Sequence, residues 1–237
     1  MKTTTALALA LCVGALSATG LRAATYNGNG DTSFGGAVGN GSLAVTDNGT
    51  DLTFTLTRGL SGDLNDVLVI YLDTAPGGIS DTSGLTDTGD GARKAISGFN
   101  GGTDRSVLSF TTGFLPEYAV TIEGGFASLF QIVSGGSHNW ITGTGQSGST
   151  SATFSLTLGL SNLGINAGDS FNLFGSYIAG SAWRSTEAIA GNGTGSTGYN
   201  PFSQSSYETY TTIPEPSSVA FLGLAGLALI GQFRRRD

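Results

Sequence analysis

Two segments near the start of the chain, 43–45 and 52–56, alternate between apolar and polar side chains. A period of two places alternate side chains on opposite faces of a β-strand. Asn48-Gly49 lies between the segments, and this dipeptide is typical of tight hairpin turns. The pattern therefore predicts a β-hairpin with its leucines, Val45 and Phe54 buried. The residues expected to face water from the second strand are Thr53, Thr55 and Thr57.

Further strand-like segments follow along the chain, separated by turns rich in Gly, Asn and Asp. Residues 67–72 are apolar throughout, which is typical of a central strand covered on both faces. Helical periodicity is nearly absent between 25 and 213. We therefore predict an all-β fold, a two-sheet antiparallel β-sandwich without a sizeable helix. The other expected strands are 118–122, 126–133, 154–158, 171–178 and 183–189.

Two glycine-rich segments, 143–151 and 191–198, contain little that could be buried, and we expect both to be surface loops. The residues after Pro201 allow two interpretations, a last edge strand around Tyr207 and Tyr210 or a spacer. Because about 190 residues suffice for one core, we assign 25–203 to a single β-sandwich domain and 204–213 to the spacer.

The first 24 residues have the order of a secretory signal peptide. Lys2 precedes an apolar core over 6–16, and the small residues Ala23 and Ala24 close the segment. We expect a signal-peptide helix over 1–24 that is cleaved after one of these alanines. An uncleaved membrane anchor is the alternative, although the apolar run is short for a bilayer core of ~30 Å.

The other end of the chain combines three features within residues 214–237. A Pro-Glu-Pro triplet comes first, an apolar run over 219–231 follows, and a basic cluster comes near the end. Thirteen helical residues rise only about 20 Å, so we expect a short transmembrane helix with the arginines on the cytoplasmic side. The residues of the triplet and the cluster are Pro214, Glu215, Pro216, Arg234, Arg235 and Arg236.

These three features, in this order at the end of the chain, resemble the PEP-CTERM sorting signal of Gram-negative bacteria. The resemblance covers about 25 residues and implies recognition by an exosortase, a membrane-embedded processing enzyme. It also implies export through the general secretion machinery, a precursor anchored in the inner membrane by the C-terminal helix, and later display at the cell surface or release. Such proteins are associated with exopolysaccharide and biofilm. A plain tail anchor is the alternative for the same residues.

Charge and cysteine content narrow the chemistry of the central domain. Five basic and fifteen acidic residues lie between 25 and 213, a net charge of −10. Such a surface repels phosphate backbones, so we expect no nucleic-acid partner. The only cysteine, Cys12, lies in the leader, which excludes disulfides and cysteine-based metal sites from the mature domain.

Catalytic motifs are scarce, and we expect a protein that is not an enzyme. Serine hydrolysis needs a base, but His138 is the only histidine and no GxSxG motif is present. His138 lies in a polar turn, where an exposed or turn-bonded histidine is expected. Glu117 and Glu123 lie six residues apart on one strand, about 20 Å from each other, too far for glycoside hydrolysis.

Aspartates are concentrated between 63 and 90, and three of them suggest the one cofactor that we consider, calcium. Asp81, Asp87 and Asp90 are separated by turn-forming residues whose carbonyls could complete an oxygen shell. The spacing fits no EF-hand. Aspartate also favours turns for its own backbone hydrogen bonds, and that is the alternative explanation.

Exposed aromatic residues would suit sugar binding, and Trp140 and Tyr199 lie in expected loops. A second resemblance points the same way. The segments VLVIYLDTAPGG, GFLPEYAV and WRSTEAI, followed by GYNP, are similar to DOMON-like and family 9 carbohydrate-binding modules over about 42–202. This resemblance implies a sandwich fold and a binding role.

From the sequence we expect an exported, non-enzymatic protein of the cell surface or extracellular matrix that is processed by an exosortase. We expect a link to exopolysaccharide or biofilm. The alternative function is a secreted carbohydrate-binding module.

Overall fold

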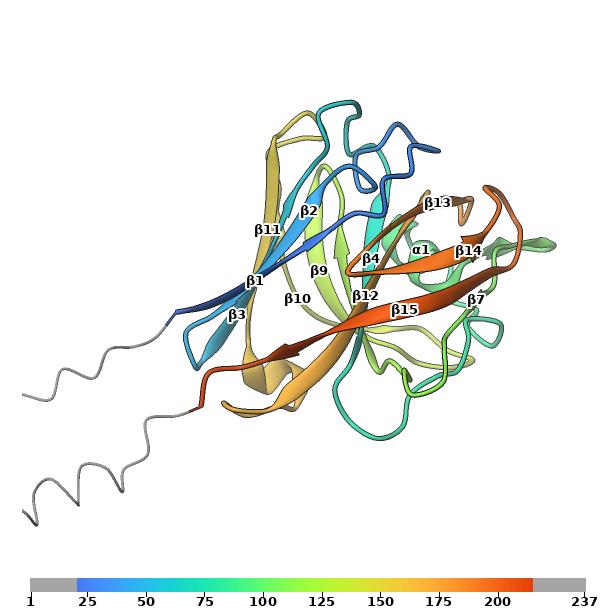
Figure 1. The fold of residues 1–237 in the computed structure, drawn as a ribbon. Helices are drawn as coiled ribbons and strands as arrows, with labels where there is room; N and C mark the ends of the chain where they lie inside the picture. Colours follow the sequence, from blue (N-terminus) through green and yellow to red (C-terminus); the bar gives the residue numbers. More distant parts are fainter. Residues whose placement is uncertain (1–20, 215–237) are drawn as a thin grey trace, which may run out of the picture. The chain divides into compact units, whose positions relative to one another are not determined.

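The computed structural model describes residues 21–214 (Figure 1). The predicted signal-peptide helix and the predicted C-terminal transmembrane helix lie outside these residues. Among residues 21–214, no helix is long and apolar enough to cross a bilayer. The first strand, β1 (Arg22–Asn27), starts inside the predicted leader. Cleavage after Ala23 or Ala24 would therefore shorten β1 but leave its residues 25–27 opposite their partner strand.

The first sheet has four antiparallel strands, and it contains the predicted hairpin. β2 (Ser42–Asp47) and β3 (Asp51–Thr57) pair so that Val45 lies opposite Phe54, as the alternation and Asn48-Gly49 predicted. The side chain of Asn48 caps the turn, because its Oδ1 accepts hydrogen bonds from the backbone amides of Thr50 and Asp51 at 2.9 and 2.8 Å. β1 pairs with β2 on one side, and β11 (Thr153–Gly159) pairs with β3 on the other.

The second sheet has nine strands, and β4 (Val67–Asp73) lies near its middle, between β8 and β12. All pairs are antiparallel except the two-residue pairing of β7 with β15. Along the sheet the order is β10 (Asn139–Gly145), β9 (Phe126–Gln131), β8 (Tyr118–Ile122), β4, β12 (Ser170–Ile178), β15 (Phe202–Thr211) and β14 (Gly191–Gly195), with β13 (Arg184–Ile189) on β12 and β7 (Leu108–Ser109) on β15.

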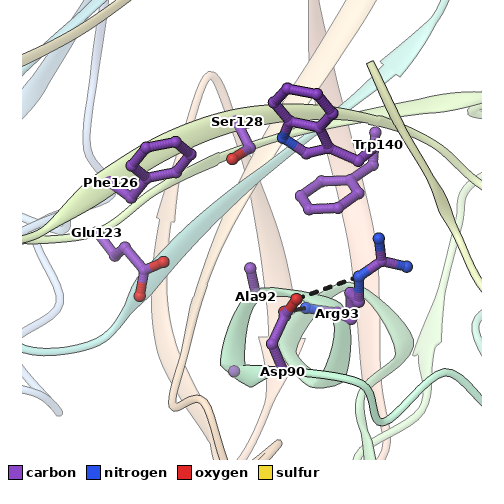
Figure 2. Close-up of a pocket in the computed structure, with 9 residues that line it drawn as sticks. Asp90, Ala92, Arg93, Glu123, Phe126, Ser128 and Trp140 are labelled. Carbon is purple, nitrogen blue, oxygen red and sulfur yellow. Dashed lines mark hydrogen bonds and ion pairs between the residues drawn. The ribbon is translucent and has the colours of Figure 1, made fainter. Parts of the chain in front are cut away.

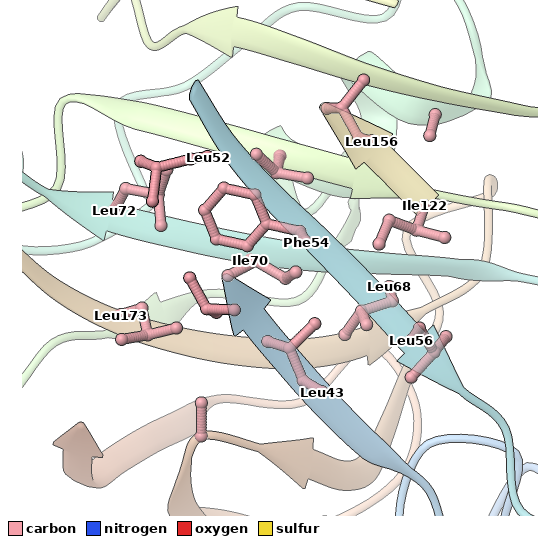
Figure 3. Close-up of a cluster of buried hydrophobic side chains, with 14 of the residues drawn as sticks. Leu43, Leu52, Phe54, Leu56, Leu68, Ile70, Leu72, Ile122, Leu156 and Leu173 are labelled. Atoms are coloured by element: carbon pink, nitrogen blue, oxygen red, sulfur yellow. The ribbon is translucent and has the colours of Figure 1, made fainter. Parts of the chain in front are cut away.

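The two sheets enclose a hydrophobic core, so the all-β prediction is confirmed. Figure 3 shows Leu52, Phe54 and Leu56 of β3 facing Ile70 and Leu72 of β4 across this core. On the outer face of the first sheet, the hydroxyls of Thr53 and Thr55 bond to their neighbours on β11. The alternating pattern therefore separates core from surface as expected.

A second apolar cluster lies on the other face of β4, where Val67, Val69 and Tyr71 are buried. This face is covered by a short helix, α1 (Gly91–Ser97), and by the segment around Leu108 and Phe114. Two short strands, β5 (Phe99–Gly101) and β6 (Asp104–Arg105), and one 3-10 turn, η1 (Leu160–Leu163), complete the elements. Burial on both faces explains why β4 is apolar throughout, as predicted.

Two sequence predictions about the later segments are wrong. Residues 191–195, expected as a loop, form β14, and 143–145 belong to β10. The glycines of β14 carry no side-chain pattern, but they let the Phe202 ring lie against the strand. A Cβ at Gly193 would lie 2.2 Å from Cε1 of Phe202. Of the two interpretations of the residues after Pro201, the structure has the strand: the assigned spacer, 204–213, is largely β15, which is not an edge strand because it pairs with both β12 and β14.

Candidate functional site

A pocket of about 310 Å³ lies between the outer edge of the second sheet and the beginning of α1 (Figure 2). β9 and β10 supply one wall, with Phe126, Ser128, Phe130 and Trp140. The beginning of α1 supplies the opposite wall through Asp90 to Arg93. Glu123, in the turn between β8 and β9, lies at one end. This volume is at the lower end of the ~300–1,000 Å³ of small-ligand pockets.

The aromatic wall follows from the period of the strands. Phe126, Ser128 and Phe130 alternate on β9 and share its outer face, whereas the residues between them enter the core. Trp140 lies opposite Phe130 in the register of β10 and β9. Phe130 is buried, but Trp140 is 55% exposed and Phe126 is 41% exposed. The pocket thus presents two accessible rings around a buried one.

A glycine shapes this wall. A Cβ at Gly143 would lie 2.6 Å from Cε1 of Phe126, so the Phe126 ring lies over β10 only because residue 143 has no side chain. Gly124 and Gly125 form the turn between the expected strands 118–122 and 126–133, and this turn carries Glu123 to the pocket. The Glu123 amide donates to the Phe126 carbonyl at 3.0 Å, which closes this turn.

The helix wall is built around Arg93. Asp90 caps α1, because its Oδ1 accepts from the Arg93 amide at 2.8 Å and its Oδ2 accepts from Arg93 Nε at 3.1 Å. Arg93 Nη1 also donates to Asp87 Oδ2 at 2.8 Å, and the guanidinium lies 5.0 Å from the centre of the Phe130 ring. The one cation of the pocket is therefore already paired with two carboxylates.

The Glu123 carboxylate differs from those of Asp87 and Asp90. It makes no hydrogen bond or ion pair with another residue in 21–214, and Figure 2 shows it directed into the space between the Phe126 ring and α1. Burial, followed by the negative charge of Asp90, raises the pKa of Glu123 above its usual value. A half-buried carboxylate that has no protein partner among the described residues and lies beside exposed rings is a group that a ligand could engage.

His138 is buried behind the pocket, 2% exposed, and bonded at both ring nitrogens. Its Nδ1 accepts from the Val133 amide at 3.2 Å, and its Nε2 lies 3.0 Å from Ser97 Oγ. Since Nδ1 accepts a hydrogen bond, the proton of the neutral ring is on Nε2. Burial lowers the pKa of His138. The prediction that His138 is hydrogen-bonded within its turn is confirmed, but the side chain is not exposed.

The structure does not bring the three predicted calcium ligands together. In the part of the chain that the structure describes, no three His, Cys, Asp or Glu side chains gather in a group that could hold a metal ion. Asp81 caps its own turn, accepting from the Ser83 amide at 2.7 Å. Asp87 and Asp90 bind Arg93 instead. Hydrogen bonds from Gly89, Arg93 and the His138 amide outweigh the effect of burial and lower the pKa of Asp87.

The two predicted sugar-binding aromatics lie in different places. Trp140 belongs to β10 and not to a loop, but it is exposed at the pocket. Tyr199 lines no part of this pocket. Its ring packs edge-on against Trp183 with 5.0 Å between centres, and its hydroxyl donates to the Ser181 carbonyl. Phe126 was not among the predicted sugar-binding residues, although it alternates with Ser128 and Phe130 in the sequence.

A second site is the junction between the domain and the predicted sorting signal. Thr212 is fully buried, and its hydroxyl donates to the Asn166 and Asp169 carbonyls. The Ile213 amide donates to Oδ1 of the buried Asp47 at 3.1 Å. Pro214, the last described residue, is exposed. Glu215, Pro216 and the three arginines lie outside the described residues.

Comparison with protein families shows that residues 212–236 match the PEP-CTERM protein-sorting motif, which confirms the prediction made from the Pro-Glu-Pro triplet, the apolar run and the arginines. No curated protein and no solved structure matches the chain. The similarity to DOMON-like and family 9 carbohydrate-binding modules therefore stays a prediction.

Proposed function

We propose that this protein, an exported chain with a PEP-CTERM motif that an exosortase processes, is a non-enzymatic component of the cell surface or extracellular matrix linked to exopolysaccharide. The main support for the proposal is the junction between the folded domain and the sorting motif. The matched motif begins at residue 212, and the folded domain holds residues 212 and 213. Processing after this point would leave a complete sandwich domain outside the membrane.

The domain offers little for catalysis in this arrangement. The one histidine is buried, and both ring nitrogens already have partners, so it is not placed to act as a general base. Glu117 lies at the opposite end of β8 from Glu123, and its Oε2 accepts from the Thr74 amide. These contacts support a binding or structural role.

Intact-mass measurement of the surface or released protein tests processing. The wild-type mass should lack Arg234, Arg235 and Arg236, and Glu215→Ala should accumulate a precursor that retains them. Glu208→Ala is the matched control, because Glu208 is an exposed carboxylate seven residues upstream on β15. A wild-type surface protein that still carries the three arginines would refute exosortase processing.

A second candidate function, glycan binding, is favoured by the two exposed rings of the pocket. Flat aromatic faces bind the apolar faces of sugar rings, and Phe126 and Trp140 present theirs beside polar groups. Trp140→Ala should abolish retention on a polysaccharide column. Trp183→Ala is the control, since Trp183 is 44% exposed but lines no part of this pocket. Equal retention of both variants and the wild type would refute the assignment.

A further inference from the structure

The charges around the pocket are unbalanced. Arg93 is the one cation among the residues that line it, and it is engaged by Asp87 behind it and Asp90 beside it. Glu123 adds a third carboxylate, which makes no hydrogen bond or ion pair with another residue among 21–214. The pocket is therefore a negatively charged recess with aromatic walls.

This arrangement discriminates among sugars by charge. A uronate would place its carboxylate near Glu123 and Asp90 without a free cation to receive it, and the acidic domain surface adds to this repulsion. A protonated amine would instead pair with Glu123 and lie close to the Phe126 and Trp140 rings, where cation–π attraction adds to the ion pair. A neutral sugar would gain only the aromatic contacts and hydrogen bonds.

We propose that the pocket formed by Glu123, Asp90, Phe126 and Trp140 binds an amine-bearing sugar, such as a glucosamine unit with a free amino group, in preference to N-acetylated or uronic sugars. The inference rests on the glycan-binding candidate above and names its ligand class. The small volume of the pocket suits one sugar ring and not a long segment of polysaccharide.

A lysine side chain carries the same charge, but the rings favour the sugar. Two exposed aromatic side chains flank the pocket, and a flexible aliphatic stem would cover less of their faces than a rigid sugar ring does. Oligolysine is therefore a competitor to be tested and not the proposed ligand.

The test is calorimetric titration of the folded domain with three hexasaccharides, made of glucosamine, N-acetylglucosamine and mannuronate. The glucosamine hexamer should bind about tenfold more tightly than the N-acetylated one, and the mannuronate hexamer should not bind. Raising the salt concentration should reduce this ratio, because a half-exposed ion pair is screened. Over the acidic range in which the sugar amine is already fully protonated, acidification through the raised pKa of Glu123 should weaken glucosamine binding and leave the N-acetylated hexamer unaffected.

Two variants separate charge from aromatic contact. Glu123→Gln should bring the affinity for the glucosamine hexamer down to that for the N-acetylated hexamer, because the amide keeps the shape and loses the charge. Trp140→Ala should weaken binding of both hexamers. Glu208→Gln, an exposed carboxylate on β15, is the charge-matched control and should change neither affinity.

The outcomes are distinguishable. Equal affinities for the two hexamers, with both lost in Trp140→Ala, would overturn the amine preference and leave glycan binding standing. Oligolysine binding as tightly as the glucosamine hexamer would overturn the preference for a sugar. Failure of every oligosaccharide to bind the folded domain would overturn glycan binding itself, while exosortase processing is judged separately by intact mass.

Discussion

Glu187 and Val38 are separated by 149 positions in sequence, yet Oε2 of the buried Glu187 lies 3.0 Å from the Val38 amide nitrogen. The same oxygen accepts from Gly39, and Oε1 accepts from Phe34 and Gly36. One carboxylate on β13 thus satisfies four amides of the loop between β1 and β2. Carboxylates that accept several backbone hydrogen bonds hold such loops strongly.

Replacing this carboxylate should destabilise the domain. In Glu187→Gln, an amide NH₂ would face two backbone N–H groups, and buried donors left without a partner cost ~1–3 kcal/mol each. We expect the free energy of unfolding in urea to fall by at least about 2 kcal/mol. Glu208→Gln, on the exposed face of β15, should change it little. Equal stability of the two variants would show that the loop does not depend on Glu187.

The junction depends on a buried hydrogen bond between Tyr210 and Asp47. The Tyr210 hydroxyl donates to Asp47 Oδ2 at 2.7 Å, and the other oxygen of Asp47 accepts from Ile213. Burial, followed by the hydrogen bond to Asp47, raises the pKa of Tyr210. Tyr210→Phe should lower the free energy of unfolding by ~1.5–3 kcal/mol, since the bond involves a charged acceptor.

Tyr207→Phe is the matched control for this prediction. Tyr207 also lies on β15, and its hydroxyl makes no hydrogen bond with the described residues, although its ring packs on Phe114. Losing this hydroxyl should change stability by less than ~0.5 kcal/mol. A loss in Tyr207→Phe as large as in Tyr210→Phe would mean that the hydroxyls act through general packing and not through Asp47.

Acidification should destabilise the domain through His138. Its pKa is lowered by burial and by Arg93, against the opposing effect of Asp87 and Asp90, so the unfolded state binds a proton more readily than the folded state. The contribution of the neutral ring is therefore complete above the unfolded pKa near 6.5 and is lost as pH falls below it. Protonation would also place an N–H at Nδ1 of His138, facing the Val133 amide, so that two donors would meet without an acceptor.

The measurement is the free energy of unfolding of wild type and His138→Gln at pH 7.5, 6.5 and 5.5. The difference between them should shrink as pH falls, because only the wild type carries the titrating ring. Comparing the two proteins removes the effects of carboxylates such as Glu117 and Glu123, whose pKa values burial raises. A difference that is constant with pH would contradict the prediction.

Calcium and chelators should leave the melting temperature unchanged, because Asp87 and Asp90 are already paired with Arg93 and no group of three ligand side chains gathers among the described residues. Arg93→Ala should instead lower the free energy of unfolding by about 3 kcal/mol, since it leaves the buried Asp87 without its partner. Lys94→Ala is the control, because Lys94 makes no ion pair within residues 21–214. A melting temperature that falls on chelation would restore the calcium hypothesis for Asp81, Asp87 and Asp90.

Features that depend on local pattern could be predicted from the amino-acid sequence. Alternation fixes which side chains share a strand face, so the hairpin of β2 and β3, the inner strand β4 and the turn at Gly124-Gly125 were all predictable. The sorting motif was predictable for the same reason, because its triplet, apolar run and arginines are read along the chain and need no partner from elsewhere in the fold.

Contacts between segments that are far apart in the sequence became apparent only in the folded structure. β14 was missed because its glycines carry no side-chain pattern, although the strand pairs with β15 and the Phe202 ring lies against it. The pocket joins a helix start, a turn and two strands, so neither the lack of a protein partner for the Glu123 carboxylate nor the pairing of Asp87 and Asp90 with Arg93 could be predicted from sequence spacing. Such relationships arise from packing and hydrogen bonding between distant elements, which local periodicity does not encode.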